Sequence, residues 1–170
     1  MSWPLVAGAG GIGCMSLLLL GGHGPAVPAE IVPGGILSQP FGCSSFELEP
    51  VEPTCPGGHI HYGIDLAAPE GTAVLAPEAG IASAGIGPSC GVQVVIDHGA
   101  GVQTVYCHLS QAAVRSGSWV AAGERIGSIG ATGMATGPHL HFEVHAAGRP
   151  LDPAAWLRSL PAYNHSSGGK

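Results

Sequence analysis

The residues best suited to chemistry in this sequence are two histidines that stand two positions apart, His139 and His141. They lie in a β-favouring run, so a strand would place both imidazoles on the same face of a sheet. Far upstream, His61 and Asp65 add two more groups that could bind a metal ion. Two histidines and a carboxylate around one ion would leave a coordination position open, as catalytic zinc requires. The pattern predicts a zinc hydrolase.

The composition describes a folded, acidic protein with many turns. The chain has 170 residues, of which 45% are hydrophobic and 9% are charged, and its formal net charge is −6. A disordered chain would need more charge and less hydrophobicity. With 29 Gly and 15 Pro, short strands joined by turns are favoured, so we expect an all-β fold of antiparallel strands. The five basic residues form no cluster, which argues against nucleic-acid binding.

The chain divides into four segments. Residues 1–22 form an apolar leader, 23–36 a Gly/Pro-rich connector, 37–160 the folded domain and 161–170 a disordered tail. Within the domain, short β-favouring runs alternate with Gly, Pro and Asp, as is typical of a β-sheet protein. An Asp-Pro pair at residues 152–153 predicts the start of a short C-terminal helix. The strand candidates are residues 63–66, 72–76, 80–84, 92–96, 102–107, 125–129 and 139–145.

The leader has three interpretations that the sequence leaves open. Residues 1–22 carry no charged side chain, and residues 3–20 are almost continuously apolar. The first is a cleaved secretory signal, because the small residues at 27–29 resemble a signal-peptide cleavage site, although no Lys or Arg precedes the apolar run. The second is an uncleaved membrane anchor, because the apolar run is just long enough to span a membrane. The third is a buried helix or strand of the folded domain. We expect an extracytoplasmic protein, secreted or anchored in the cell envelope, with membrane contact through residues 3–20.

Cysteine usage favours an oxidising compartment. Cys43 and Cys55 bracket a short loop that leads into the His61 region. Cys90 and Cys107 flank two strand candidates that would lie side by side in a hairpin. Two disulfides would suit an exported enzyme, whereas buried free thiols in a reducing compartment are the alternative. The connectivity stays open at this point.

Several separated motifs resemble those of the lysostaphin-like zinc metalloendopeptidases, peptidoglycan hydrolases with a duplicated hybrid motif fold. The resemblance covers about residues 40–157, with the motifs in the family's order. It implies an antiparallel β-sheet groove or sandwich with a short C-terminal helix. The motifs are His61-x-Gly-x-Asp65, Gly71-Thr-x-Val-x-Ala76, Val95-Ile-Asp-His-Gly99, Tyr106-x-His108-Leu109, Val120-x-x-Gly123-x-x-Ile126-Gly127 and Thr136-Gly-Pro-His-Leu-His-Phe-Glu-Val144.

The resemblance implies roles for five residues. His61, Asp65 and His141 would bind one Zn²⁺ ion per chain, and His108 and His139 would be catalytic histidines that do not bind it. The enzyme would be a zinc metalloendopeptidase that cleaves peptide bonds of bacterial peptidoglycan, and we expect it to act as a monomer. Imidazoles titrate near neutral pH, so the two catalytic histidines could share the base and oxyanion-stabilising roles. Which histidine is the base and which bond is cut stay open.

Other polar residues near these motifs have simpler interpretations. Glu143 lies by alternation on the same face as His141, where it could orient that imidazole, but we expect a surface carboxylate. Asp97 and His98 fall at a predicted turn and are expected to be structural. We expect His145 to be exposed to solvent.

Two other kinds of protein share parts of this pattern. A biotinyl or lipoyl carrier domain would need a lysine at a hairpin tip, but the only lysine of the chain is Lys170 at its terminus. A catalytically silent relative, acting as a cell-wall-binding or hydrolase-activator module, would usually have lost a metal ligand. All three expected ligands and both accessory histidines are present. The enzyme is therefore the favoured hypothesis, and the silent module is the alternative.

Overall fold

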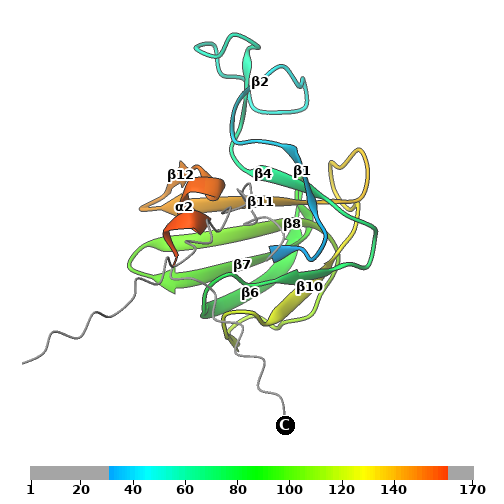
Figure 1. Ribbon diagram of the computed structural model, residues 1–170, viewed down its shortest axis with the longest axis vertical. Helices are drawn as coiled ribbons and strands as arrows, with labels where there is room; N and C mark the ends of the chain where they lie inside the picture. Colours follow the sequence, from blue (N-terminus) through cyan, green and yellow to red (C-terminus); the bar gives the residue numbers. More distant parts are fainter. Residues whose placement is uncertain (1–30, 161–170) are drawn as a thin grey trace, which may run out of the picture.

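A large antiparallel sheet forms the body of the protein. Residues 31–160 are described by the computed structural model. The strands of this sheet are β1 (Ile36–Gln39), β4 (Ile64–Ala67), β5 (Ala73–Leu75), β6 (Gly80–Gly87), β7 (Gly91–Gly99), β8 (Val102–Ala112), β9 (Trp119–Val120), β10 (Arg125–Ile129), β11 (His139–Ala146) and β12 (Arg149–Leu151). Their spatial order is β1-β4-β11-β8-β7-β6-β9, with β10 pairing with β5 and β8, and β12 with β11. The four longest strands, β6, β7, β8 and β11, lie side by side (Figure 1).

The core forms where apolar residues alternate with polar ones along the central strands. In β11, Leu140, Phe142 and Val144 are fully buried. The residues that alternate with them, which include His139 and His141, are only partly buried. Successive side chains of a strand point to opposite faces of the sheet. The alternation that fills the core therefore places both histidines on the opposite face.

The hairpin of β7 and β8 ends in the predicted turn. The Asp97 carboxylate accepts a hydrogen bond from the Gly99 N–H at 2.8 Å, which shapes the turn. His98 uses both ring nitrogens, with Nδ1 2.8 Å from the Ala79 carbonyl oxygen and Nε2 2.8 Å from the Thr104 hydroxyl. Both residues are structural, as the sequence predicted.

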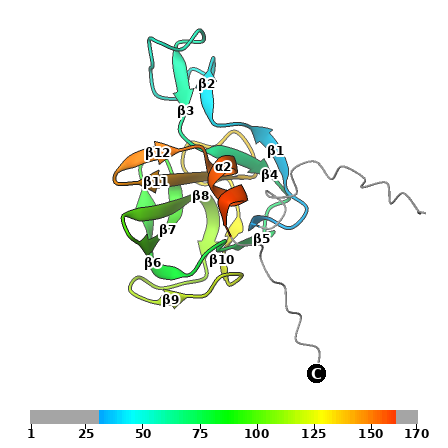
Figure 2. The same cartoon turned by 60° about the vertical axis from the view of Figure 1, so that its left-hand side comes forward.

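Residues 42–61 form a separate two-stranded extension, which we call the finger. Its strands β2 (Gly42–Ser44) and β3 (His59–His61) pair with each other and not with the large sheet. A disulfide between Cys43 and Cys55 closes the loop between these strands. Figures 1 and 2 show the finger projecting beyond β1 and β4. Its base carries His61, so the finger brings one of the predicted site residues to the sheet.

The all-β prediction is confirmed, and each of the seven strand candidates overlaps a strand. The C-terminal helix α2 (Pro153–Ser159) begins as predicted, with the Asp152 carboxylate accepting a hydrogen bond from the Ala154 N–H. It lies beside β11 (Figure 2). Five strands were not predicted: β1, β2, β3, β9 and β12. Each of them has only two to four residues, too few to show a recognisable alternation.

The core begins earlier in the chain than residue 37, where the sequence led us to start the domain. Ile31 and Val32 are both buried within it. The predicted leader (1–22), its Cys14 and the predicted tail (161–170) lie outside the described residues. Within residues 31–160, no helix is long and apolar enough to cross a membrane.

Candidate active site

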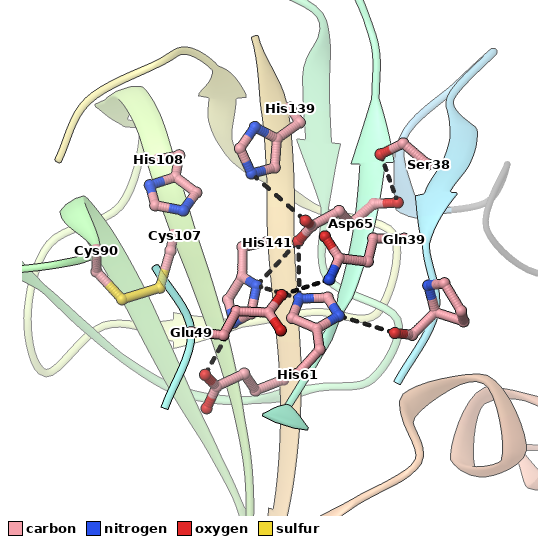
Figure 3. Close-up of polar contacts among 12 residues, drawn as sticks. Ser38, Gln39, Glu49, His61, Asp65, Cys90, Cys107, His108, His139 and His141 are labelled. Carbon is pink, nitrogen blue, oxygen red and sulfur yellow. Dashed lines mark hydrogen bonds and ion pairs between the residues drawn. A yellow bond between two sulfur atoms is a disulfide. The ribbon is translucent and has the colours of Figure 1, made fainter. Parts of the chain in front are cut away.

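Three side chains from different strands meet in one cluster, which we call the triad: His61 from β3, Asp65 from β4 and His141 from β11. β4 and β11 are neighbours, and their register places Asp65 opposite His141. The His61 Nε2 atom lies 3.0 Å from His141 Nδ1 and 3.2 Å from Asp65 Oδ1 (Figure 3). The His141 Nδ1 atom lies 2.9 Å from the same Asp65 oxygen.

A glycine between two members of the triad makes room for this approach. A Cβ atom on Gly63 would come within 2.8 Å of His141 Cε1 and 2.6 Å of the Phe142 carbonyl oxygen. Any larger residue would force the His141 ring or the β11 backbone to shift. The His-x-Gly-x-Asp spacing therefore has a steric reason in addition to a chemical one.

Each imidazole of the triad is held at its other nitrogen. His61 Nδ1 donates to the Pro40 carbonyl oxygen at 2.9 Å, and His141 Nε2 lies 2.9 Å from Glu143 Oε1. These contacts leave His61 Nε2 and His141 Nδ1 directed toward Asp65. Such partners fix the tautomer and the ring orientation of metal-binding histidines.

Glu143 is not the surface carboxylate that the sequence led us to expect. Its side chain is 21% exposed and contacts two imidazoles, His141 through Oε1 and His145 through Oε2 at 2.6 Å. His145, expected to be solvent-exposed, is half-buried in this contact. The prediction was wrong because β11 runs between β4 and β8, and these neighbouring strands shield its polar face.

Hydrogen bonds set the protonation of the triad in the absence of a metal ion. Burial disfavours the charged form of Asp65, but hydrogen bonds from His141 and His61 hold the pKa of its carboxyl well below its usual range. Burial also disfavours the charged form of His141, yet its contacts with Asp65 and Glu143 raise the pKa of this imidazole to about 9. The same contacts, with that of His145, lower the pKa of Glu143 against the effect of its burial.

The donor set and its spacing fit a zinc ion. Metal bonds of about 2.0–2.1 Å at tetrahedral angles would separate neighbouring ligand atoms by about 3.3 Å. The three triad atoms lie 2.9 to 3.2 Å apart. Among residues 31–160, no other group of three or more His, Cys, Asp or Glu side chains converges in this way. In the same groove, the Glu49 Oε2 atom is buried without a hydrogen-bond partner among the described residues. A cation bound in the groove would offset the negative charge of this carboxylate.

Two further histidines lie at the rim of the triad. The His139 Nε2 atom lies 3.8 Å from Asp65 Oδ2, and its Nδ1 donates to the Gly137 carbonyl oxygen at 2.8 Å. The His108 ring centroid lies 4.7 Å from that of His139, and His108 Nδ1 donates to the Thr132 carbonyl oxygen at 2.8 Å. Both rings use Nδ1 for a backbone contact, so Nε2 remains for chemistry in the groove (Figure 3).

His108 is suited to accept a proton. Burial lowers the pKa of its imidazole, and the neighbouring His139 and His141 lower it further, against the opposing effects of the Thr132 carbonyl and Asp65. The ring is therefore mainly neutral at pH 7. Because Nδ1 carries the proton that it donates to Thr132, the lone pair is on Nε2.

The five predicted site residues line one groove between the finger, the turn between β6 and β7, and the loop that follows β10. The described residues that line it include three carboxylates, Glu49, Asp65 and Glu143, and neither lysine nor arginine. The groove is thus acidic, with partly apolar walls. The apolar lining includes Phe46, Leu48 and Val51 of the finger and Met134 on the opposite side.

Some residues of the groove carried no signal in the sequence. Gln39 Nε2 donates to Glu49 Oε1, and His59 Nδ1 donates to the Glu49 carbonyl oxygen at 2.8 Å. Glu49 reaches the groove only because the finger folds back toward β1, and Thr132 reaches His108 only through a long-range loop contact. His59 is not part of the triad.

The four cysteines of the domain form two disulfides, Cys43 with Cys55 and Cys90 with Cys107. The first lies in the finger. The second lies beside His108 (Figure 3). This pairing is the one that the bracketed loop and the β7–β8 hairpin would allow.

The sequence and the fold are both similar to known peptidases. The chain is 40% identical over 110 residues to the peptidoglycan DD-endopeptidase ShyA of Vibrio cholerae, which is 64% of this chain and 26% of that protein. It spans less than a third of the length of the curated relatives it matches. Its structure resembles the catalytic domain of the antimicrobial peptidase lysostaphin from Staphylococcus simulans, with a TM-score of 0.62, 32% identity, and coverage of 74% of this chain and 94% of that domain.

A zinc-containing peptidase from Vibrio cholerae is similar as well, with a TM-score of 0.60 and 32% identity over 72% of this chain and 37% of that one. The family model of Peptidase family M23 matches residues 59–153, more than half of the chain. That span includes the whole triad and both rim histidines. The chain therefore belongs to peptidase family M23, as its separated motifs predicted.

Proposed function

We propose that this protein is a zinc-dependent endopeptidase that hydrolyses peptide bonds of bacterial peptidoglycan outside the cytoplasm. The observation that carries the proposal is the convergence of His61, Asp65 and His141, with two more histidines beside them in an open groove. Membership of a peptidase family supports the reaction class. The peptidoglycan substrate rests on relatives such as ShyA, whose name states that activity.

The triad would hold the metal through His61 Nε2, Asp65 and His141 Nδ1. A bound zinc ion would lower the pKa of a water molecule and polarise the scissile carbonyl group. Glu143 and the Pro40 carbonyl oxygen keep the two imidazoles in the tautomers that present these nitrogens. Three protein ligands leave room for water or substrate, as a catalytic site needs.

His108 would act as the general base. Its neutral ring offers the Nε2 lone pair, and the Thr132 carbonyl oxygen holds the Nδ1 proton in place. After taking a proton from the attacking water, the imidazolium could donate it to the departing amine. Because the pKa of His108 is lowered, the imidazole is unprotonated at neutral pH and can accept the proton of the attacking water.

His139 would stabilise the negative charge that develops on the carbonyl oxygen. Its Nδ1 carries the proton that the ring donates to the Gly137 carbonyl oxygen, so Nε2 can donate to the oxyanion when the ring is an imidazolium. Asp65 Oδ2 lies 3.8 Å from His139 Nε2, within ion-pair distance of such an imidazolium. A donor aimed at the developing oxyanion is a large contribution to amide hydrolysis.

The test combines metal analysis with a product assay. The purified chain should contain one zinc per molecule and should release soluble peptides with new amino groups from purified cell walls. Chelation should stop the release, and added zinc should restore it. A protein that binds zinc but releases no peptide from several wall types would contradict the proposal and favour the silent wall-binding module. The described residues retain both the triad and the rim histidines, so no observation now favours that alternative.

A further inference from the structure

Cys107 and His108 are consecutive residues of β8, yet both line the groove. In a regular strand, neighbouring side chains point to opposite faces of the sheet. The residues on either side, Tyr106 and Leu109, both lie in the core. The alternation of β8 is therefore interrupted at the position of the rim histidine.

A β-bulge causes the interruption. β7 pairs Val92 with Leu109 and Val94 with Tyr106, so one residue of β7 opposes two residues of β8. A bulge of this kind inserts an extra residue into one strand and redirects side chains, and bulges are frequent beside active sites. Here the extra residue turns His108 away from the core and into the groove.

The bulge needs support because His108 has a left-handed backbone. Its φ is +63°, a conformation that side chains other than glycine rarely adopt. Its N–H donates to the Cys90 carbonyl oxygen at 2.7 Å. Cys90 is also disulfide-bonded to Cys107, the other residue of the bulge. One residue of the neighbouring turn thus holds the bulge both by a hydrogen bond and by a covalent bond.

The imidazole of His108 is held through Thr132. The Thr132 carbonyl oxygen accepts the hydrogen bond from His108 Nδ1. The Thr132 hydroxyl donates to the Leu109 carbonyl oxygen at 2.7 Å and accepts from the Val92 N–H at 2.9 Å. Val92 and Leu109 are the pair that closes one end of the bulge. The group that orients the ring is therefore tied to the same stretch of sheet.

The loop that carries Thr132 rests on the turn that carries Cys90. A Cβ atom on Gly133 would come within 2.3 Å of the Gly91 nitrogen and 2.7 Å of the Cys90 carbonyl carbon. The Met134 N–H donates to the Ser89 carbonyl oxygen at 2.8 Å. If this turn moved, the loop and its contact with the His108 ring would move with it.

We propose that the Cys90–Cys107 disulfide is a positioning element for catalysis. It ties the turn to the bulge, and through the Thr132 loop it fixes the direction of His108 Nε2 toward the triad. The inference rests on the proposed function for the catalytic role of His108. The Cys43–Cys55 disulfide has no such contact with His108 and provides a matched control.

The test removes each disulfide in turn by a double substitution, both in the wild-type protein and in the His108→Ala variant. Cys90→Ala/Cys107→Ala should lower kcat for peptide release roughly 10- to 100-fold, the effect of a catalytic group displaced by about 1 Å. Zinc content and KM should stay unchanged. In a His108→Ala background the same double variant should cause no further loss, because the disulfide acts through that imidazole. Cys43→Ala/Cys55→Ala should change kcat by the same factor in both backgrounds.

Two outcomes would overturn the proposal. The first is a folded Cys90→Ala/Cys107→Ala protein with unchanged kcat. The second is a loss that persists in full after His108→Ala, which would indicate general destabilisation. If the double variant does not fold, Thr132→Val removes the hydroxyl contacts while it keeps the disulfide, and the same dependence on His108 is expected. An unchanged kcat for that variant would equally count against the proposal.

A measurement that does not depend on hydrolysis separates this inference from the proposed function. NMR of ¹⁵N-histidine-labelled protein should show the His108 Nδ1 proton exchanging slowly with water in the wild type. Exchange should be faster in Cys90→Ala/Cys107→Ala and unchanged in Cys43→Ala/Cys55→Ala. Faster exchange in a chain that cleaves no peptide would support the positioning while contradicting the function. Normal cleavage with unchanged exchange would support the function and overturn the positioning.

Discussion

Asp65 and His141 face each other across the β4–β11 pair, and the Asp65 Oδ1 atom lies 2.9 Å from His141 Nδ1. The strand register alone brings these two groups together, without any flexible loop. His61 then approaches from the finger, so the sheet supplies two of the three donors and the finger supplies the third. A site built on strands in this way holds its ligands more rigidly than a site built on loops.

Replacing Asp65 by asparagine should abolish zinc binding and activity together. The substitution keeps the size of the side chain but removes the negative charge that offsets the metal. Zinc per chain, measured by mass spectrometry after dialysis, should fall from one to near zero. Asp97→Asn is the matched control, since Asp97 shapes a turn outside the groove through one oxygen that asparagine retains. Retention of zinc by Asp65→Asn would contradict the ligand assignment.

The core and the side-chain faces of β11 could be predicted because their signals are local. The two-residue alternation of a strand places His139 and His141 on the same face of β11, independently of which strands pair with it. Separated motifs in a recognisable order then connected them with His61 and Asp65. The finger and β1 could not be predicted, because their short strands form through partners distant in the sequence.

Contacts that depend on neighbouring strands also could not be predicted from the sequence. Alternation placed Glu143 on the correct face, but its burial comes from β4 and β8 on either side. The bulge at His108 breaks the alternation of β8, and only the register with β7 reveals it. Likewise, no local pattern indicates that Thr132 would hold the His108 ring.

Replacing His108 by alanine should leave zinc in place and lower kcat by ~10²-fold or more, the usual scale for a general base. Burial lowers the pKa of His108 below its ordinary value of 6.5, and a bound cation would lower it further. Activity should therefore fall only as the pH drops below 6.5, when this imidazole gains a proton. The kcat–pH profile should lose this acidic limb in His108→Ala.

His98→Asn is the control for that profile, because His98 lies on β7 with both ring nitrogens bonded outside the groove. Its acidic limb should match that of the wild type. Full activity of His108→Ala would show that another group removes the proton from water.

The metal-free protein should lose stability as the pH rises from 6.5 through about 9. His141 has its pKa raised from 6.5 to about 9, so the folded protein retains a proton that the unfolded chain releases in this interval. The contribution is fully present below pH 6.5 and amounts to roughly 3 kcal/mol, since one pKa unit corresponds to about 1.4 kcal/mol. Urea unfolding at a series of pH values should show this slope in the wild type and not in His141→Gln. An equal slope in both proteins would place the proton elsewhere.

Replacing Glu143 by glutamine should weaken zinc binding without removing the site. The carboxylate accepts a hydrogen bond from His141 Nε2 at 2.9 Å, so Nδ1 is the ring nitrogen that would bind the metal ion. A neutral amide holds the ring less firmly and makes the imidazole less basic, so the zinc affinity should fall roughly 10- to 100-fold. Competition with a chromogenic chelator measures the change, and activity should return at saturating zinc. Glu70→Gln, at an exposed carboxylate, should leave the affinity unchanged. Equal affinities for Glu143→Gln and the wild type would mean that the Glu143 contact does not orient the ligand.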